Sequence, residues 1–160
     1  MRYSKGATSG MVVAGGNGPG INDTQLYSPT GIYLDTSTDS LYIANRDAHN
    51  IICWRLGDTR WKHIAGNLNG LSGITQTQFN WPWDVKLDPM GNVYVVDRSN
   101  SRLQFFLSGQ SNATTIAGVR GVTGTSANLF NLPYSLSFDS QLNIYVADTF
   151  NLRIQKFLRY

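Results

Sequence analysis

A long internal repetition constrains this chain more than any other feature. The segment NVYVVDRSNSRLQFF at 92–106 returns 51 residues later as NIYVADTFNLRIQKF at 143–157, and eight of the fifteen paired positions are identical. Three further landmarks recur at intervals of 51 to 53 residues: an Ala-Gly pair, a proline, and an aspartate that ends an apolar run. They are Ala14-Gly15, Ala65-Gly66 and Ala117-Gly118; Pro29, Pro82 and Pro133; and Asp35, Asp88 and Asp139. Self-similarity at a fixed period of this length predicts a repeat architecture.

Within one period, four short runs have the pattern of β-strands. The first alternates apolar and polar residues, as in GIYLD, DVKLD and SLSFD. The second is apolar on both faces (LYIA, VYVV, IYVA), as expected of a strand between two layers. The third is NIICWRL, SRLQFFL or LRIQKFL, and the fourth WKHIAG or ATTIAG. Polar, glycine-bearing turns such as DPMGN at 88–92 separate the runs, and no segment has a sustained helical period.

Four short antiparallel strands with two apolar faces predict one blade of a β-propeller. A single blade cannot bury both faces alone, so it must stack between neighbours. We therefore expect an all-β fold with about three four-stranded blades in one segment, 1–160. Its expected parts are a lone outer strand at 11–15, blades at 29–66 and 82–118, and an incomplete blade at 133–160. A solenoid of β-coils is the alternative, although its repeats are usually shorter.

Composition agrees with this architecture and excludes several classes of protein. Charged residues make up 14% of the chain, whereas aromatic residues (12%) and glycines (16) are plentiful, which suits strands and turns. The net charge of +3 is far below that of an Arg/Lys-rich nucleic-acid arm. Cys53 is the single cysteine, which rules out an internal disulfide framework. The first residues contain no long apolar run, so we expect neither a signal peptide nor a membrane span, and no targeting signal indicates a compartment.

The end of each second strand resembles the NHL repeat. The run DTFNLRIQ at 148–155 matches its pattern well, and DRSNSRLQ at 97–104 follows it closely. The first copy departs from the pattern, with Asn45, Ala48 and Asn50 in place of Asp, Asn and Arg. The resemblance extends from about residue 12 to 160 and implies an NHL-type propeller, commonly six-bladed. It says little about function, because this fold carries unrelated activities.

The repeated polar residues are expected to be structural. An acid–base pair needs two carboxylates that converge on one cleft, whereas here each aspartate recurs once per blade with its own arginine. A carboxylate after a buried strand can instead accept hydrogen bonds from loop N–H groups. The predicted structural signature is Asp97, Asn100 and Arg102 in one copy, and Asp148, Asn151 and Arg153 in the next.

No catalytic residue, metal site or cofactor is predicted. A zinc site needs three or four convergent ligands, and the two histidines, His49 and His63, occupy different parts of their repeat. NHL-like amidating lyases use a metal site with several histidines, more than this chain has. The glycine-rich run GGNGPG at 15–20 lacks the helix and lysine of a phosphate-binding loop, so we interpret it as a turn.

Positions that vary between repeats are the better candidates for function. In a propeller, the fourth-to-first connections and the second-to-third loops share the face around the channel mouth. This face is expected to combine residue types that are enriched at binding hot spots. The predicted ligand-binding rim is Trp81, Trp83, Tyr134, Arg46, Arg98 and Asn80. The alternative for the two tryptophans is that they fill the gap between adjacent blades, and for the two arginines that they form a solvated rim.

These observations favour a non-catalytic scaffold that binds a protein or peptide through its rim. The alternatives are an RNA-binding propeller, as in some NHL-containing regulators, and a metal-dependent lyase or hydrolase. Three blades cannot close a disc, since propellers typically have 4–8 blades. The chain is therefore expected to be a segment of a longer propeller or half of a homodimer with six blades.

Overall fold

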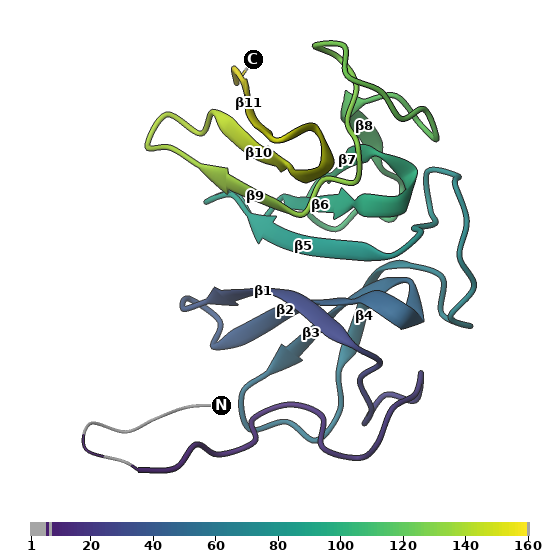
Figure 1. Ribbon diagram of the computed structural model, residues 1–160. Coiled ribbons are helices and arrows are strands. Elements are labelled where there is room, and N and C mark those ends of the chain that lie inside the picture. The colour runs from purple at the N-terminus through teal and green to yellow at the C-terminus, as the bar shows by residue number, and fades with distance from the viewer. Residues whose placement is uncertain (1–5, 7, 160) are drawn as a thin grey trace.

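The computed structural model describes residue 6 and residues 8–159, which form three antiparallel β-sheets stacked side by side (Figure 1). The first sheet contains β1 (Pro29–Asp35), β2 (Ser40–Asn45), β3 (Asn50–Arg55) and β4 (Lys62–Gly66). The second contains β5 (Pro82–Leu87), β6 (Val93–Asp97), β7 (Arg102–Phe106) and β8 (Thr114–Gly118). The third contains β9 (Ser135–Phe138), β10 (Ile144–Asp148) and β11 (Arg153–Phe157). The prediction of an all-β fold of blade-like sheets is confirmed.

The second and third strands of every sheet are joined by the same tight turn. One turn of 3-10 helix follows each second strand, at η1 (Arg46–Ala48), η2 (Arg98–Asn100) and η3 (Thr149–Asn151). Each ends at a residue with positive φ, namely His49 (52°), Ser101 (52°) and Leu152 (55°). The backbone N–H of that residue donates to the first carbonyl of the turn. The repetition in sequence is thus a repetition in backbone conformation.

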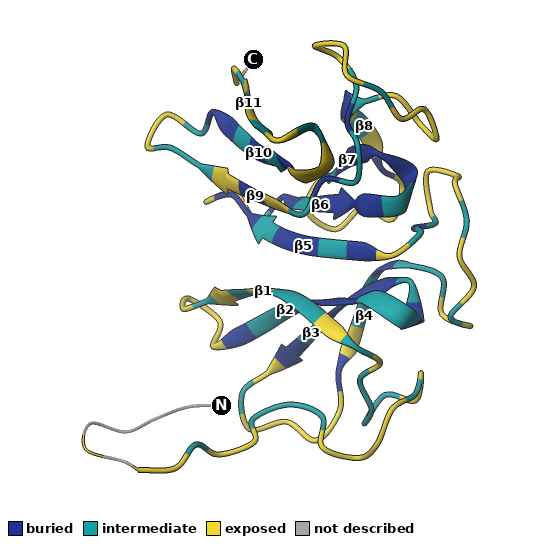
Figure 2. Ribbon diagram, viewed as in Figure 1, coloured by how far each residue is buried: buried dark blue, intermediate teal, exposed yellow. Residues whose placement is uncertain are grey.

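The apolar residues lie mainly between the sheets. One cluster, which includes Ala44, Ile51, Val85 and Val95, fills the space between the first and second sheets. Another cluster, which includes Val96 and Val146, lies between the second and third sheets. The middle sheet is therefore covered on both faces, and Figure 2 shows buried residues along its strands β5 and β6.

The two outward faces of the stack are only partly covered. On the first sheet, Ile43 and Ile52 are buried under Ala14 and Leu26, but Ile32 on β1 is 57% exposed. On the third sheet, Ile154 of β11 is 67% exposed. Large apolar side chains at both ends of the stack are thus open to solvent.

The expectation of a lone strand at 11–15 needs correction. Within the described residues, the first strand begins at Pro29, and the segment before it runs along the first sheet as irregular chain. A strand needs an edge to pair with, and the free edge of the third sheet, at β11, lies at the opposite end of the stack (Figure 1). Within the described residues, segment 11–15 thus contributes one isolated bridge residue, Met11, and no strand.

Candidate binding rim

The loops predicted to form a rim do meet on one face of the stack. The turn after each second strand is bonded to the connection that precedes the first strand of its own sheet. Three equivalent backbone hydrogen bonds make this contact, from Asp47 N to Tyr27 O (3.1 Å), Ser99 N to Asn80 O (3.0 Å) and Phe150 N to Asn131 O (3.2 Å). In Figure 1 this face lies on the right, with the long connection between β4 and β5.

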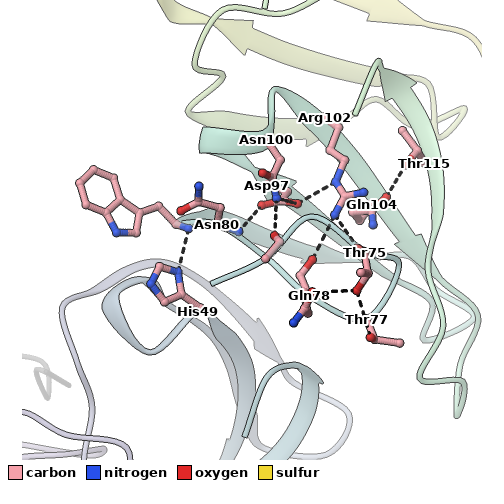
Figure 3. Close-up of polar contacts among 12 residues, drawn as sticks. His49, Thr75, Thr77, Gln78, Asn80, Asp97, Asn100, Arg102, Gln104 and Thr115 are labelled. Atoms are coloured by element: carbon pink, nitrogen blue, oxygen red, sulfur yellow. Dashed lines mark hydrogen bonds and ion pairs between the residues drawn. The ribbon is translucent and has the colours of Figure 1, made fainter. Parts of the chain in front are cut away.

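A buried ion pair fastens each connection to its sheet. In the second sheet, the carboxylate of Asp97 accepts hydrogen bonds from Asn100 Nδ2, Arg102 Nε and the backbone N–H of Asn80, each at 2.8 Å (Figure 3). Burial raises the pKa of Asp97 to about 6, while the bonds from Asn100 and Asn80 and the charge of Arg102 act to lower it. At neutral pH the carboxylate is therefore ionised and fully engaged.

The guanidinium of Arg102 extends this network into the connection. Its Nη2 donates to the carbonyl oxygens of Thr75 (2.8 Å) and Gln78 (3.1 Å). Arg153 in the third sheet makes the equivalent bonds to Ser126 O (2.8 Å) and Leu129 O (2.9 Å). Arg153 also donates from Nη1 to Thr125 O (2.6 Å). Each arginine thus neutralises the aspartate of its own blade and holds at least two carbonyls of the incoming chain.

Asp148 occupies the same place in the third sheet. It accepts hydrogen bonds from Asn131 N (2.7 Å), Asn151 Nδ2 (2.9 Å) and Arg153 Nε (2.8 Å). Burial acts to raise its pKa, but these bonds outweigh burial and hold the pKa of Asp148 below the ordinary value. Each of the two aspartates thus bonds to the arginine, asparagine and connection of its own blade.

In the first sheet, different residues hold the incoming connection to the sheet. Asn45 stands in the aspartate position and accepts from Tyr27 N at 2.5 Å. The indole N–H of Trp61 donates to Asn22 O (3.1 Å) and Gln25 O (2.9 Å). These two carbonyls lie 53 residues before those of Thr75 and Gln78, in the equivalent part of the repeat. Trp61 was missed by the sequence prediction because it lies in a different column of the repeat from the arginines.

Five of the six predicted rim residues come together in one cluster, which we call the rim cluster: Arg46, Trp81, Trp83, Arg98 and Tyr134. Arg46 Cζ lies 5.6 Å from the ring centroid of Trp81 and 5.5 Å from that of Trp83. Arg98 Cζ lies 4.7 Å from both Trp83 and Tyr134. The two guanidinium groups therefore lie among three aromatic rings, at distances where cation–π attraction operates.

The sixth predicted residue, Asn80, has another place. Its backbone N–H donates to Asp97 and its carbonyl accepts from Ser99 N, so it joins the connection to the sheet. Phe150 lies beside the cluster instead, with its ring centroid 6.4 Å from that of Tyr134. Phe150 follows the variable position Thr149 in the third turn, which is the signal that would have found it.

The backbone of Trp81 is held in a conformation that favours glycine. Its φ is 54°, in the left-handed region, and Pro82 follows it directly. The N–H of Trp81 donates to Nδ1 of His49 at 3.1 Å (Figure 3). Burial lowers the pKa of His49, which keeps that nitrogen unprotonated and able to accept. His49 thus fixes Trp81 across the boundary between the first and second sheets.

The two arginines of the cluster differ in their charge balance. Arg46 pairs with Asp47 through two hydrogen bonds, from Nε (2.9 Å) and Nη2 (2.8 Å). Arg98 is 8% exposed, its Nη2 donates to Tyr134 Oη (3.1 Å), and its Nε has no hydrogen-bond partner in the described part of the chain. Among residues 8–159, no carboxylate forms an ion pair with Arg98.

A hollow of about 480 Å³ adjoins the cluster on the side of the innermost strands. Its wall includes Trp83 and Tyr134 of the cluster, together with residues of β1, β5 and β9. Asp84 at its base accepts from Ser135 Oγ (2.8 Å) and Leu136 N (3.1 Å) and pairs with Lys86 (2.7 Å). The aromatic pair therefore faces a partly polar space in which the acidic group is already satisfied.

In the described part of the chain, no three histidine, cysteine, aspartate or glutamate side chains lie close enough together to hold a metal ion. None of the helices in this part is long and apolar enough to cross a membrane.

The chain is similar to known proteins in sequence and in fold. The profile of the NHL repeat matches residues 79–106. NHL repeat-containing protein 3 of Mus musculus is 34% identical over 86 residues, which is 54% of this chain and 24% of that protein. The chain therefore spans about a quarter of the length of this curated relative.

Two solved structures with a similar fold come from Bacteroides thetaiotaomicron. A structural genomics protein of unknown function has a TM-score of 0.67 at 18% identity, and the match covers 80% of this chain and 34% of that one. An auxiliary nutrient binding protein has a TM-score of 0.64 at 21% identity, covering 78% and 36% of the two chains. At these identities the likeness concerns the fold alone.

Proposed function

Since the chain belongs to the NHL-repeat family and has a β-propeller-like fold, we propose that it is a non-catalytic scaffold that binds a protein or peptide through the rim cluster. The observation that carries this proposal is the convergence of two tryptophans, a tyrosine and two arginines from three sheets on one face. Tryptophan, tyrosine and arginine dominate the binding energy of protein interfaces. The ring of Trp81 provides accessible apolar surface, because this residue is 42% exposed.

The alternative interpretation is that the tryptophans fill the gap between adjacent blades. It applies in part to Trp83. Its ring packs at 4.6 Å from that of Tyr134 on the next sheet. Trp81 is the more exposed of the two. We therefore assign Trp81 to direct contact with the partner and Trp83 to support of the cluster.

A peptide suits this surface better than RNA. RNA-binding surfaces stack exposed bases on open aromatic faces and neutralise several phosphates. In the rim cluster, the faces of Trp83 and Tyr134 are already occupied by Arg98 and by each other. The charges of Arg46, Arg98 and Asp47 sum to a local net charge of only +1.

A role as a metal-dependent lyase or hydrolase has less support. The signature carboxylates of Asp97 and Asp148 are engaged by the arginine and asparagine of their own blade. Both groups anchor backbone and do not face a shared cleft. The scaffold role therefore agrees better with how these side chains are used.

Site-specific photo-crosslinking tests the proposal. The variant Trp81→benzoylphenylalanine places a photoreactive ring on the rim, and Met90→benzoylphenylalanine places one on the turn between β5 and β6, which is also exposed. We expect a ribonuclease-resistant protein adduct from position 81 that is absent at position 90 and is lost when Trp83→Ala is added. Equal adducts at both positions, or adducts that ribonuclease removes, would contradict the proposal.

A further inference from the structure

We propose that the rim cluster receives a carboxylate group of its peptide partner, and that Arg98 is the group that binds it. This inference rests on the proposed function and names the chemistry of the ligand. It starts from the difference between the two arginines that occupy equivalent positions in the first and second sheets.

Arg46 carries its own counter-ion and Arg98 does not. The two residues begin equivalent turns, η1 and η2, 52 residues apart. The residue after Arg46 is Asp47, which binds the guanidinium through both carboxylate oxygens. The residue after Arg98 is Ser99, and none of the carboxylates in the described chain takes the place of Asp47.

Burial makes the missing counter-ion significant. A charged side chain that is removed from water normally has a charged or hydrogen-bonded partner for each of its donors. Only 8% of Arg98 is exposed, yet within the described residues its Nε is unpaired and its Nη2 has only the neutral Tyr134 Oη. A guanidinium has five N–H donors in a fork that matches a carboxylate. The aromatic rings hold this fork in place before any ligand arrives.

The charge of the surroundings favours a carboxylate over a phosphate. The charges of Arg46 and Asp47 cancel each other, and the nearby Asp84 and Lys86 form a second neutral pair. Arg98 is thus left with one positive charge, which a single carboxylate balances. A phosphate group at neutral pH carries about 1.5 to 2 negative charges and would leave part of that charge uncompensated.

The exposed ring of Trp81 indicates what should accompany the carboxylate. Its centroid lies 6.0 Å from Arg98 Cζ, so a ligand that reaches the guanidinium also meets the indole. We expect an acidic residue beside an apolar side chain. The carboxylate itself has two sources in a peptide, an Asp or Glu side chain or the free C-terminus.

Four synthetic peptides separate these possibilities. Acetyl-Ala-Leu-Glu-Leu-Ala-amide offers a side-chain carboxylate, and acetyl-Ala-Leu-Gln-Leu-Ala with a free C-terminus offers a terminal one. The third peptide is the Gln peptide with an amidated C-terminus, and it has no carboxylate. The fourth contains phosphoserine and therefore carries a phosphate. Affinity is measured by tryptophan fluorescence and by calorimetry on the full 160-residue chain. We expect one or both carboxylate peptides to bind at least about tenfold more tightly than the amidated Gln peptide, which corresponds to one charge-assisted contact.

Two substitutions at position 99 test the role of Arg98 without altering it. Ser99→Asp supplies the counter-ion that Asp47 supplies in the first sheet, and we expect it to reduce carboxylate binding at least about tenfold. Ser99→Ala is the matched control and should bind like the wild type. Asp47→Asn releases Arg46 and should tighten binding. Ser99 is half-buried and its side chain carries no structural hydrogen bond within the described residues, so both variants should fold.

The possible outcomes are distinct. Equal affinity for the Glu and amidated Gln peptides, tighter binding of the phosphoserine peptide, or undiminished binding by Ser99→Asp would overturn the carboxylate inference. Absence of saturable binding of every carboxylate peptide up to about 1 mM, which is weaker than about −4 kcal/mol, would overturn it as well. In each case a rim-specific crosslink at position 81 would leave the proposed function standing, whereas loss of that crosslink would remove both.

Discussion

Trp61 of the first sheet and Arg102 of the second sheet hold equivalent pairs of backbone carbonyls, although they come from different columns of the repeat. The indole of Trp61 contacts Asn22 O and Gln25 O, and the guanidinium of Arg102 contacts Thr75 O and Gln78 O. The guanidinium also requires a buried carboxylate, whereas the neutral indole does not. In keeping with this difference, the first copy has neither the aspartate nor the arginine, and Asn45 and Asn50 stand in their places.

The first prediction concerns a substitution of Trp61 that removes the indole N–H and keeps an aromatic ring. Trp61→Phe leaves the carbonyl of the partly buried Gln25 without the indole donor, whereas the carbonyl of the exposed Asn22 still accepts from Gln25 N (2.8 Å). An unsatisfied buried polar group costs about 1–3 kcal/mol, and we expect a loss of this size in the free energy of unfolding by urea. Trp61→Ala, which also creates a cavity, should lose more, about 3–5 kcal/mol. A Phe variant as stable as the wild type would disprove the bridging role.

The second prediction concerns the buried ion pair of the middle sheet. Arg102→Gln leaves the carboxylate of Asp97 buried without its cation, and both side chains have no exposed surface. We expect a loss of about 3–5 kcal/mol in unfolding free energy. Adding Asp97→Asn makes both positions neutral, as the equivalent residues Asn45 and Asn50 are in the first sheet. The double variant should therefore be more stable than Arg102→Gln alone, and additive effects in this double-mutant cycle would exclude the coupling.

Much of this architecture follows from the repetition in the sequence. Strands such as β6 and β10 are predictable because alternation and turn residues recur in each copy. The rim cluster is predictable because Arg46, Trp81 and Tyr134 vary at equivalent positions. The role of Trp61 could not be predicted in this way. Aligning the copies compares residues at equivalent positions, and Trp61 is not at the position equivalent to Arg102. The segment 11–15 shows a second limit, since a strand needs a partner edge and the local pattern does not say whether one is near.

The third prediction is a pH dependence that comes from the turn between β9 and β10. Hydrogen bonding from Asn143 is the main reason that the pKa of Asp139 is lowered to about 2. The folded pKa lies below the unfolded value of 3.8, so the ionised group stabilises the fold above about pH 4 and this contribution disappears as the pH falls to about 2. Asp139→Asn should be less stable than the wild type at pH 6, and the difference should shrink steadily toward pH 2. A difference that does not change over this range would contradict the assignment.

The fourth prediction separates binding from folding at the rim. Trp81 has a φ of 54°, and glycine adopts this conformation without a steric cost. Trp81→Gly should therefore change the unfolding free energy by less than about 1 kcal/mol, while it removes the exposed ring. Binding of the carboxylate peptides should weaken at least about tenfold, as for loss of a hot-spot residue. Trp81→Ala is the comparison variant: it should lose binding equally but be less stable than Trp81→Gly.

The fifth prediction follows from the two uncovered faces at the ends of the stack. Ile32 and Leu34 on the first sheet, and Ile154 on the third, are more than 40% exposed. The middle sheet shows how such faces are normally used, since Val85 and Val96 on its two faces are buried by the neighbouring sheets. We propose that the end faces are covered in the same way, either by a second copy of this chain or by further blades of a longer one. Static light scattering on the 160-residue chain should then give a dimer or larger species, and Ile154→Lys together with Leu34→Lys should shift the population toward monomer. A monodisperse species of 17.7 kDa for the unsubstituted chain would refute the homodimer.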